Sequence, residues 1–134
     1  GKGKLYQQLK DFIKTHNLEE HVELTGFVNN PYPLIKSADI FVLSSIAEGL
    51  PTVVGEAMVL GVPVVSTNCP GSREILDHGN FGILTDQDDH ALYLGIKSLF
   101  GVDQRAYFRA RSMERARIFD DQFALKEYES ILES

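Results

Sequence analysis

The sequence has little cysteine and no long apolar run, and these two absences exclude several classes of protein. Its lone cysteine, Cys69, excludes an internal disulfide framework and a zinc site built from cysteines, because both need several thiols. No segment approaches the roughly 20 apolar residues of a membrane-spanning helix, and residues 1–10 lack the apolar centre of a signal peptide. We therefore expect a reducing, cytoplasmic setting.

Positive charge is also scarce, with 13 basic against 19 acidic residues and a net charge of -6. Nucleic-acid-binding domains use a basic field, so we expect no nucleic-acid partner. The chain does carry five arginines between residues 105 and 117, interleaved with Tyr107, Phe108 and Met113. This pattern favours the solvated face of an amphipathic helix over a lipid or nucleic-acid site.

The length of 134 residues, with 43% hydrophobic residues, is typical of one soluble domain spanning residues 1–134. The sequence shows no internal repeat and no linker rich in proline, glycine or serine. It begins at Gly1 without an initiator methionine, so we expect a domain cut from a longer protein and truncated at its N-terminus.

Hydrophobic periodicity predicts strands that alternate with helices. Residues 4–16 carry apolar residues at the i, i+4, i+7, i+8 spacing of one helical face, and residues 40–43 and 63–66 are continuous apolar runs. Such runs are typical of parallel strands buried on both faces. The predicted strands are 22–24, 40–43, 63–66 and 82–85; the predicted helices are 4–16, 31–37, 52–60, 71–76, 88–100, 103–117 and, after a break near Asp120 and Asp121, 123–133. The sequence therefore predicts an α/β domain with a parallel sheet.

The segment 44–58 places a turn containing glycine between a parallel strand and a helix. Pro51 suits the first helical position, and Gly61 suits the left-handed residue that follows a helix. Open α/β sheets bind ligands at this edge, and backbone N–H groups near Leu50, Thr52 and Val53 would meet the positive end of the helix dipole. The segment therefore predicts an anion site suited to phosphate.

Two carboxylates flank that site, Glu48 before the turn and Glu56 in the helix. They would repel phosphates on contact but could accept hydrogen bonds from neutral hydroxyls, such as those of sugars. From composition alone, the favoured interpretation is that Glu48 is a solvated loop acid and Glu56 a surface helix residue.

The wider pattern resembles that of the family 4 glycosyltransferases. Seven residues separate the two glutamates, Gly-Leu-Pro follows the first, and Ala-Met follows the second. The blocks at 22–28, 38–42, 61–67 and 79–84 are similar to that family's flanking blocks in order and spacing, so the resemblance covers about residues 1–100.

The resemblance implies the C-terminal, donor-binding half of a two-domain GT-B enzyme, with a Rossmann-like parallel sheet flanked by helices. It implies a retaining glycosyltransferase that uses a nucleotide-diphospho-sugar as donor, with no cofactor and no metal in the donor site. By the same resemblance, Glu56 binds ribose hydroxyls and Glu48 lies beside the transferred sugar as the catalytic residue. Backbone groups of Gly49, Leu50, Pro51 and Thr52 would hold sugar and diphosphate, and Phe27 and Val28 would line the base.

Three departures from the family pattern concern what this chain does not contain. The family's Arg-Lys pair, its N-terminal acceptor domain and the first two strands of its donor domain have no counterpart here. We therefore expect residues 1–134 alone to transfer no sugar. Exposed strand edges would then favour self-association or a sheet in which strand 22–24 pairs with strand 40–43.

Two other functions stay open. A GT-B relative such as a sugar-nucleotide epimerase, or a glycogen or sucrose synthase, would share these motifs. A noncatalytic nucleotide-binding or scaffold domain would keep them by descent. The resemblance most often implies a polysaccharide or glycolipid product, and it leaves open a peripheral contact of the intact protein with a membrane.

The metal-like motif Asp86-Gln87-Asp88 directly precedes an amphipathic helix, so we interpret it as a helix cap rather than a metal site. The four histidines lack ligand-like spacing and are interpreted as surface or capping residues.

Overall fold

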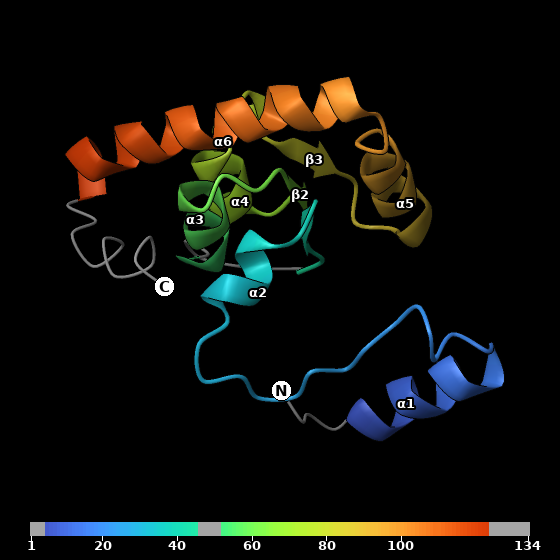
Figure 1. The fold of residues 1–134 in the computed structure, drawn as a ribbon. Helices are drawn as coiled ribbons and strands as arrows, with labels where there is room; N and C mark the ends of the chain where they lie inside the picture. Colours follow the sequence, from blue (N-terminus) through green and yellow to red (C-terminus); the bar gives the residue numbers. More distant parts are fainter. Residues whose placement is uncertain (1–4, 46–51, 124–134) are drawn as a thin grey trace. The chain divides into compact units, whose positions relative to one another are not determined.

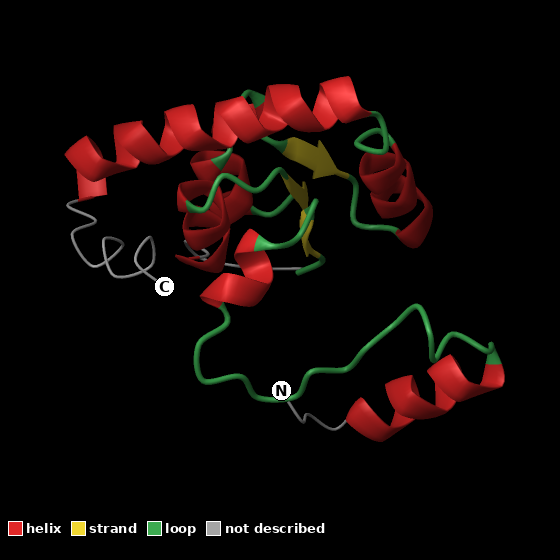
Figure 2. Ribbon diagram, in the orientation of Figure 1, coloured by secondary structure: helices red, strands yellow, loops and turns green. Residues whose placement is uncertain are grey.

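The computed structural model describes residues 5–45 and 52–123, with the side chains of 119–123 excepted. The chain divides into two compact units, an N-terminal unit of residues 1–31 and a C-terminal unit of residues 32–134 (Figures 1 and 2).

The N-terminal unit contains helix α1 (Tyr6–Thr15) followed by irregular chain. The helix ends as predicted, because Asn17 adopts a left-handed φ of 57° and the N–H of Leu18 bonds the carbonyl of Ile13 at 2.8 Å. The prediction of a strand at 22–24 is wrong, since these residues are irregular. A strand needs a hydrogen-bonded neighbour, and the described part of this unit holds no other extended segment that pairs with them.

The C-terminal unit alternates strands and helices, as predicted. Its elements are α2 (Tyr32–Lys36), β1 (Phe41–Leu43), α3 (Thr52–Val59), β2 (Val64–Thr67), α4 (Pro70–Ile75), the short 3-10 helix η1 (Asp77–Gly79), β3 (Ile83–Thr85), α5 (Asp89–Lys97) and α6 (Val102–Phe123). Gly61 has a φ of +75° just after α3, and the Asp88 side chain accepts a 2.7 Å hydrogen bond from the Ala91 N–H at the start of α5. Both predicted helix boundaries are confirmed.

The three strands form a parallel sheet in the order β1-β2-β3. The rearranged four-stranded sheet is therefore not formed by the described residues. All four residues of β2 are buried, whereas Val42 in β1 is 38% exposed because β1 lies at an edge of this sheet. The prediction of burial on both faces holds for β2 and is wrong for β1.

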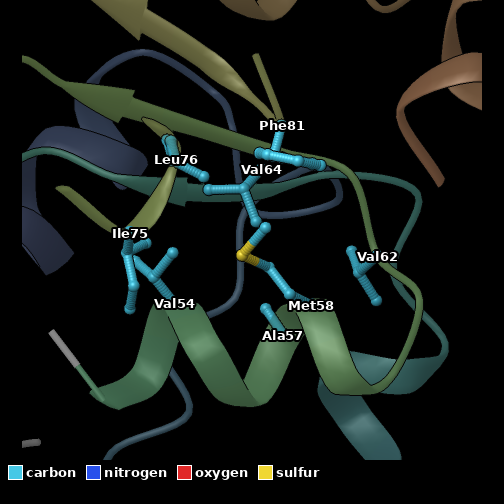
Figure 3. Packing of buried hydrophobic residues seen from close by; sticks show 8 residues of the cluster. All are labelled: Val54, Ala57, Met58, Val62, Val64, Ile75, Leu76 and Phe81. Carbon is cyan, nitrogen blue, oxygen red and sulfur yellow. The ribbon is translucent and has the colours of Figure 1, made fainter. Parts of the chain in front are cut away.

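One face of the sheet packs on α3 and α4. Figure 3 shows Val54, Ala57 and Met58 pointing from α3 toward Val64 of β2. These four side chains have no exposed surface, and they form one buried cluster with Leu76 and three further residues. This cluster is the core against which α3 packs, and Glu56 lies on α3.

The opposite face packs on α5. A glycine at position 95 permits a close approach, because a Cβ there would lie 2.6 Å from Thr85 Cγ2 and 3.2 Å from Val65 Cγ1. The register pairs Val65 with Ile83 and Thr67 with Thr85, so these four residues share the face under α5. The fold is thus a sheet with helices on both faces.

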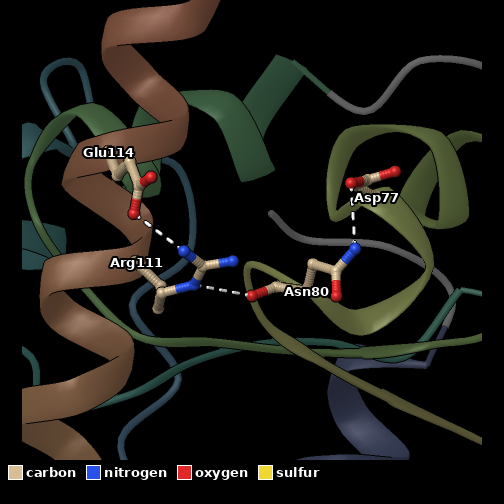
Figure 4. Close-up of polar contacts among 4 residues, drawn as sticks. All are labelled: Asp77, Asn80, Arg111 and Glu114. Atoms are coloured by element: carbon tan, nitrogen blue, oxygen red, sulfur yellow. Dashed lines mark hydrogen bonds and ion pairs between the residues drawn. The ribbon is translucent and has the colours of Figure 1, made fainter.

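Helix α6 is held to the rest of the C-terminal unit by three of its arginines, Arg105, Arg111 and Arg115, so the interpretation of a solvated face is wrong for these three. Arg109 and Arg117 are exposed, as that interpretation expects. In Figure 4, Arg111 donates to the Asn80 carbonyl at 2.9 Å and to Glu114 at 2.8 Å, while the Asn80 amide donates to Asp77 at 3.0 Å. The Arg111 guanidinium also lies 4.3 Å from the centre of the Phe81 ring, within the range of a cation–π contact.

Two more arginines and a serine extend this attachment. Arg115 donates to the carbonyls of Glu74 and Ile75 at 3.0 and 2.9 Å, which satisfies the end of α4. Arg105 donates to the carbonyls of Leu99 and Phe100 after α5, and the buried Ser112 hydroxyl donates to the Val62 carbonyl at 2.9 Å.

The predicted break near residue 120 is wrong, because α6 continues to Phe123. The segment contains neither glycine nor proline to end the helix. The predicted helix 123–133 lies almost wholly outside the described residues.

We expect Gly95→Ala to lower the free energy of unfolding by up to about 2 kcal/mol, measured by urea denaturation. Overpacking costs typically about 1–3 kcal/mol, against roughly 1 kcal/mol that alanine gains over glycine in a helix. Thr85→Ser removes the methyl group that a new Cβ would meet, so the double variant should recover part of the loss. Additive effects of the two substitutions would contradict this packing explanation.

Candidate functional site

The carboxyl ends of the three parallel strands lie at one edge of the sheet, where polar residues follow each strand. Ser44 and Ser45 follow β1, Asn68 follows β2, and Asp86 and Gln87 follow β3. A pocket of about 280 Å³ opens at this edge. It is lined by Ser44, Ser45, Thr67, Gln87, Asp88, Asp89 and Leu92.

Hydrogen bonds join the three strand ends to one another. The Thr67 hydroxyl lies within hydrogen-bond reach of the Ser45 carbonyl and, at 3.5 Å, of the Leu43 carbonyl. On the other side, the Asn68 N–H donates to the Thr85 carbonyl at 2.8 Å and the Gln87 amide donates to the Asn68 carbonyl at 3.1 Å. The edge is therefore held together by its own polar groups.

A buried hydroxyl cluster lies just beneath this edge, at the start of α4. The hydroxyls of Ser66 and Ser72 are 2.7 Å apart, and the Cys69 thiol donates to Ser72 at 3.4 Å. All three side chains are fully buried. Cys69 is therefore a packed residue of the α4 N-terminus.

Glu56 lies in the second turn of α3 and is half-buried. Its Oε1 accepts a hydrogen bond from the Tyr32 hydroxyl at 3.4 Å, a contact that links α3 to α2. Thr52 is exposed at the first position of α3, four residues before Glu56, so the two side chains share a helix face. The structure thus brings together two of the predicted site residues.

The other predicted site residues are not joined to this pair. Glu48, Gly49, Leu50 and Pro51 lie outside the described residues. The N-terminal unit contains Phe27, which is 81% exposed, and Val28, which is half-buried.

Sequence reasoning missed Tyr32 and Thr67. Thr67 is the last residue of the buried strand β2, so its hydroxyl needs a hydrogen-bond partner at the strand end. Tyr32 gave no such signal, because its partner Glu56 is 24 residues away in the sequence.

Across the described ranges, no three His, Cys, Asp or Glu side chains are placed to hold a metal ion. Within residues 5–45 and 52–123, no helix combines the length and hydropathy needed to cross a membrane.

The profile of the glycosyl transferases group 1 family matches residues 1–112. The chain belongs to this family. The expected family resemblance is confirmed.

Curated relatives carry transferase names. The chain is 34% identical over 123 residues to the Campylobacter jejuni N-acetylgalactosamine-N,N'-diacetylbacillosaminyl-diphospho-undecaprenol 4-alpha-N-acetylgalactosaminyltransferase, covering 90% of this chain and 34% of that protein. It is 30% identical over 146 residues to the putative colanic acid biosynthesis glycosyltransferase WcaL of Escherichia coli K12, covering 100% of this chain and 36% of the relative. The chain thus spans about a third of the length of these relatives.

Solved structures share its fold. TarM superimposes with a TM-score of 0.78 at 20% identity, over 98% of this chain and 27% of that chain. Sucrose-phosphate synthase from Thermosynechococcus elongatus superimposes with a TM-score of 0.75 at 22% identity, over 98% and 36%. The expected Rossmann-like architecture of a GT-B C-terminal domain is confirmed.

The bonds at the sheet edge generate a prediction about Thr67. Thr67→Val keeps the side-chain volume and removes the hydroxyl, so we expect a loss of about 1 kcal/mol in the free energy of unfolding. Thr67→Ser keeps the hydroxyl and serves as the control. A valine variant with the urea midpoint of the wild-type protein would show that the hydroxyl contributes nothing.

Proposed function

We propose that this chain is the donor-binding domain of a retaining glycosyltransferase that moves a hexose from a nucleotide-diphospho-sugar to an acceptor hydroxyl. The observation that carries the proposal is Glu56, a half-buried carboxylate on a helix that starts at the carboxyl edge of the sheet. In this role Glu56 accepts hydrogen bonds from the ribose hydroxyls of the nucleotide.

Two features of α3 support the accompanying phosphate site. The first N–H groups of a helix have no partner inside the helix, and they carry the positive end of its dipole. Thr52 at that end is exposed, so its hydroxyl is open to a ligand. In the proposal, residues 49–52 hold the diphosphate and the sugar.

The proposed reaction breaks the bond between the sugar and the diphosphate. A new glycosidic bond forms to the acceptor oxygen, the nucleoside diphosphate leaves, and the proton of the acceptor hydroxyl passes to an oxygen of the leaving diphosphate. Glu48 lies beside the transferred sugar in this scheme, and hydrogen-bond donors on the leaving phosphate provide much of the stabilisation. No metal or cofactor takes part in the proposed donor site.

The intact protein requires more than this chain. We infer that an acceptor-binding domain and a basic pair outside residues 1–134 complete the site, so that residues 1–134 alone bind donor and transfer nothing. The name of the Campylobacter relative includes a diphospho-undecaprenol acceptor, which supports a lipid-linked sugar acceptor for this protein. A cytoplasmic site and a polysaccharide product complete the proposal.

Calorimetric titration of the intact protein with UDP, GDP, ADP and CDP tests the binding function. A donor-binding domain should release or absorb heat with at least one of them. A scaffold that kept the motif by descent should give no binding signal with any.

For Glu56→Ala, we expect weaker nucleoside diphosphate binding, by about 1.5–3 kcal/mol, because a charge-assisted hydrogen bond is worth roughly that amount. Dissociation constants measured by calorimetry report the change. A matched Glu74→Ala variant, on α4, should leave the constant unaltered. An unchanged constant in Glu56→Ala would remove this residue from the ribose role.

For Glu48→Gln, the expected change is in turnover. The substitution keeps the side chain's shape and removes its charge, so kcat should fall by more than the nucleotide affinity does. Steady-state kinetics of the intact protein and calorimetry of the same preparation give the two values. A loss of affinity with normal kcat would assign Glu48 to binding instead.

A further inference from the structure

We propose that Tyr32 is a positioning residue that orients the Glu56 carboxylate for the ribose, an inference that rests on the proposed function. Tyr32 is the first residue of α2, and Glu56 lies on α3. Their side chains meet through the hydrogen bond from the Tyr32 hydroxyl to Glu56 Oε1, at 3.4 Å in a half-buried setting.

A glutamate side chain needs such a partner if it is to present one fixed geometry. Its terminal torsion is broad, so the carboxylate turns easily when nothing holds it. The Tyr32 hydroxyl restrains that torsion by donating to one oxygen. A carboxylate offers about four lone-pair sites, so it can accept from Tyr32 and from a ribose hydroxyl at the same time. A ligand that meets a preoriented carboxylate loses less entropy on binding.

The packing of α2 separates this role from a purely structural one. Ile35 of α2 and Ala38 after it pack against the buried cluster. These apolar contacts hold α2 to the core, and removing only the Tyr32 hydroxyl leaves them in place. Tyr32→Phe removes the donor to Glu56 and keeps the ring.

The experiment uses the intact protein and the nucleoside diphosphate among UDP, GDP, ADP and CDP that binds it most tightly, together with the 2′,3′-dideoxy form of that nucleotide. The dideoxy form lacks the hydroxyls that Glu56 would bind. Tyr32→Phe is compared with wild type, with Glu56→Gln, and with Tyr107→Phe, a control that removes a hydroxyl from an exposed tyrosine of α6. Thermal melting establishes that each variant is folded.

We expect Tyr32→Phe to weaken binding of the ribonucleotide about three- to tenfold, as the loss of one hydrogen-bond partner would. Its affinity for the dideoxy form should stay at the wild-type value. The ratio of the ribonucleotide affinity to the dideoxynucleotide affinity should therefore fall. Glu56→Gln should reduce the same ratio, and Tyr32→Phe should add little in the Glu56→Gln background. Tyr107→Phe should change neither affinity.

Two results overturn the positioning role alone. In one, Glu56→Gln reduces the ratio while Tyr32→Phe leaves both affinities unchanged. In the other, Tyr32→Phe weakens both nucleotides equally, as general damage to the fold would. If the wild-type protein binds none of the four nucleotides, or if Glu56→Gln leaves the ratio unchanged, the proposed ribose site fails and the positioning role fails with it.

Discussion

The burial of β2 on both faces is the constraint from which the rest of the C-terminal unit follows. All four of its residues are buried, so helices must cover the sheet on both sides. Helical crossovers between successive strands make the sheet parallel. Parallel strands place all their carboxyl ends at one edge. The polar residues 44–45, 68 and 86–87, together with the first turn of α3, are gathered at that edge for this reason alone.

The opposite edge is occupied by α6. Its anchors reach the Val62 carbonyl before β2, the Asn80 carbonyl before β3, and the final carbonyls of α4. Each of these groups lies at the amino side of the sheet or at the end of a helix that returns to it. The arginines thus satisfy backbone carbonyls on the side away from the candidate site. The attachment of α6 leaves the carboxyl edge open to a ligand.

The sequence was sufficient for features set by local chemistry and insufficient for those set by distant partners. The apolar runs predicted the strands, Asp88 predicted a helix cap, and Gly61 predicted a helix end. These predictions succeeded because periodicity and backbone preference act within a few residues. The strand at 22–24 failed because pairing depends on a neighbour. The contact of Tyr32 with Glu56 and the carbonyl partners of Arg111 could not be predicted, since sequence spacing does not report distances between elements.

In the proposed function, the spacing of Thr52 and Glu56 also orients the nucleotide along α3. Four residues rise about 6 Å along a helix, so the two groups lie about one turn apart on one face. The helix dipole acts within the first turn, which favours the negatively charged phosphates near Thr52 and leaves the neutral ribose to Glu56. A carboxylate nearer the N-terminus of α3 would repel the phosphates, and one farther along would miss the ribose. In the proposal, the position of Glu56 therefore separates the two parts of the ligand by charge.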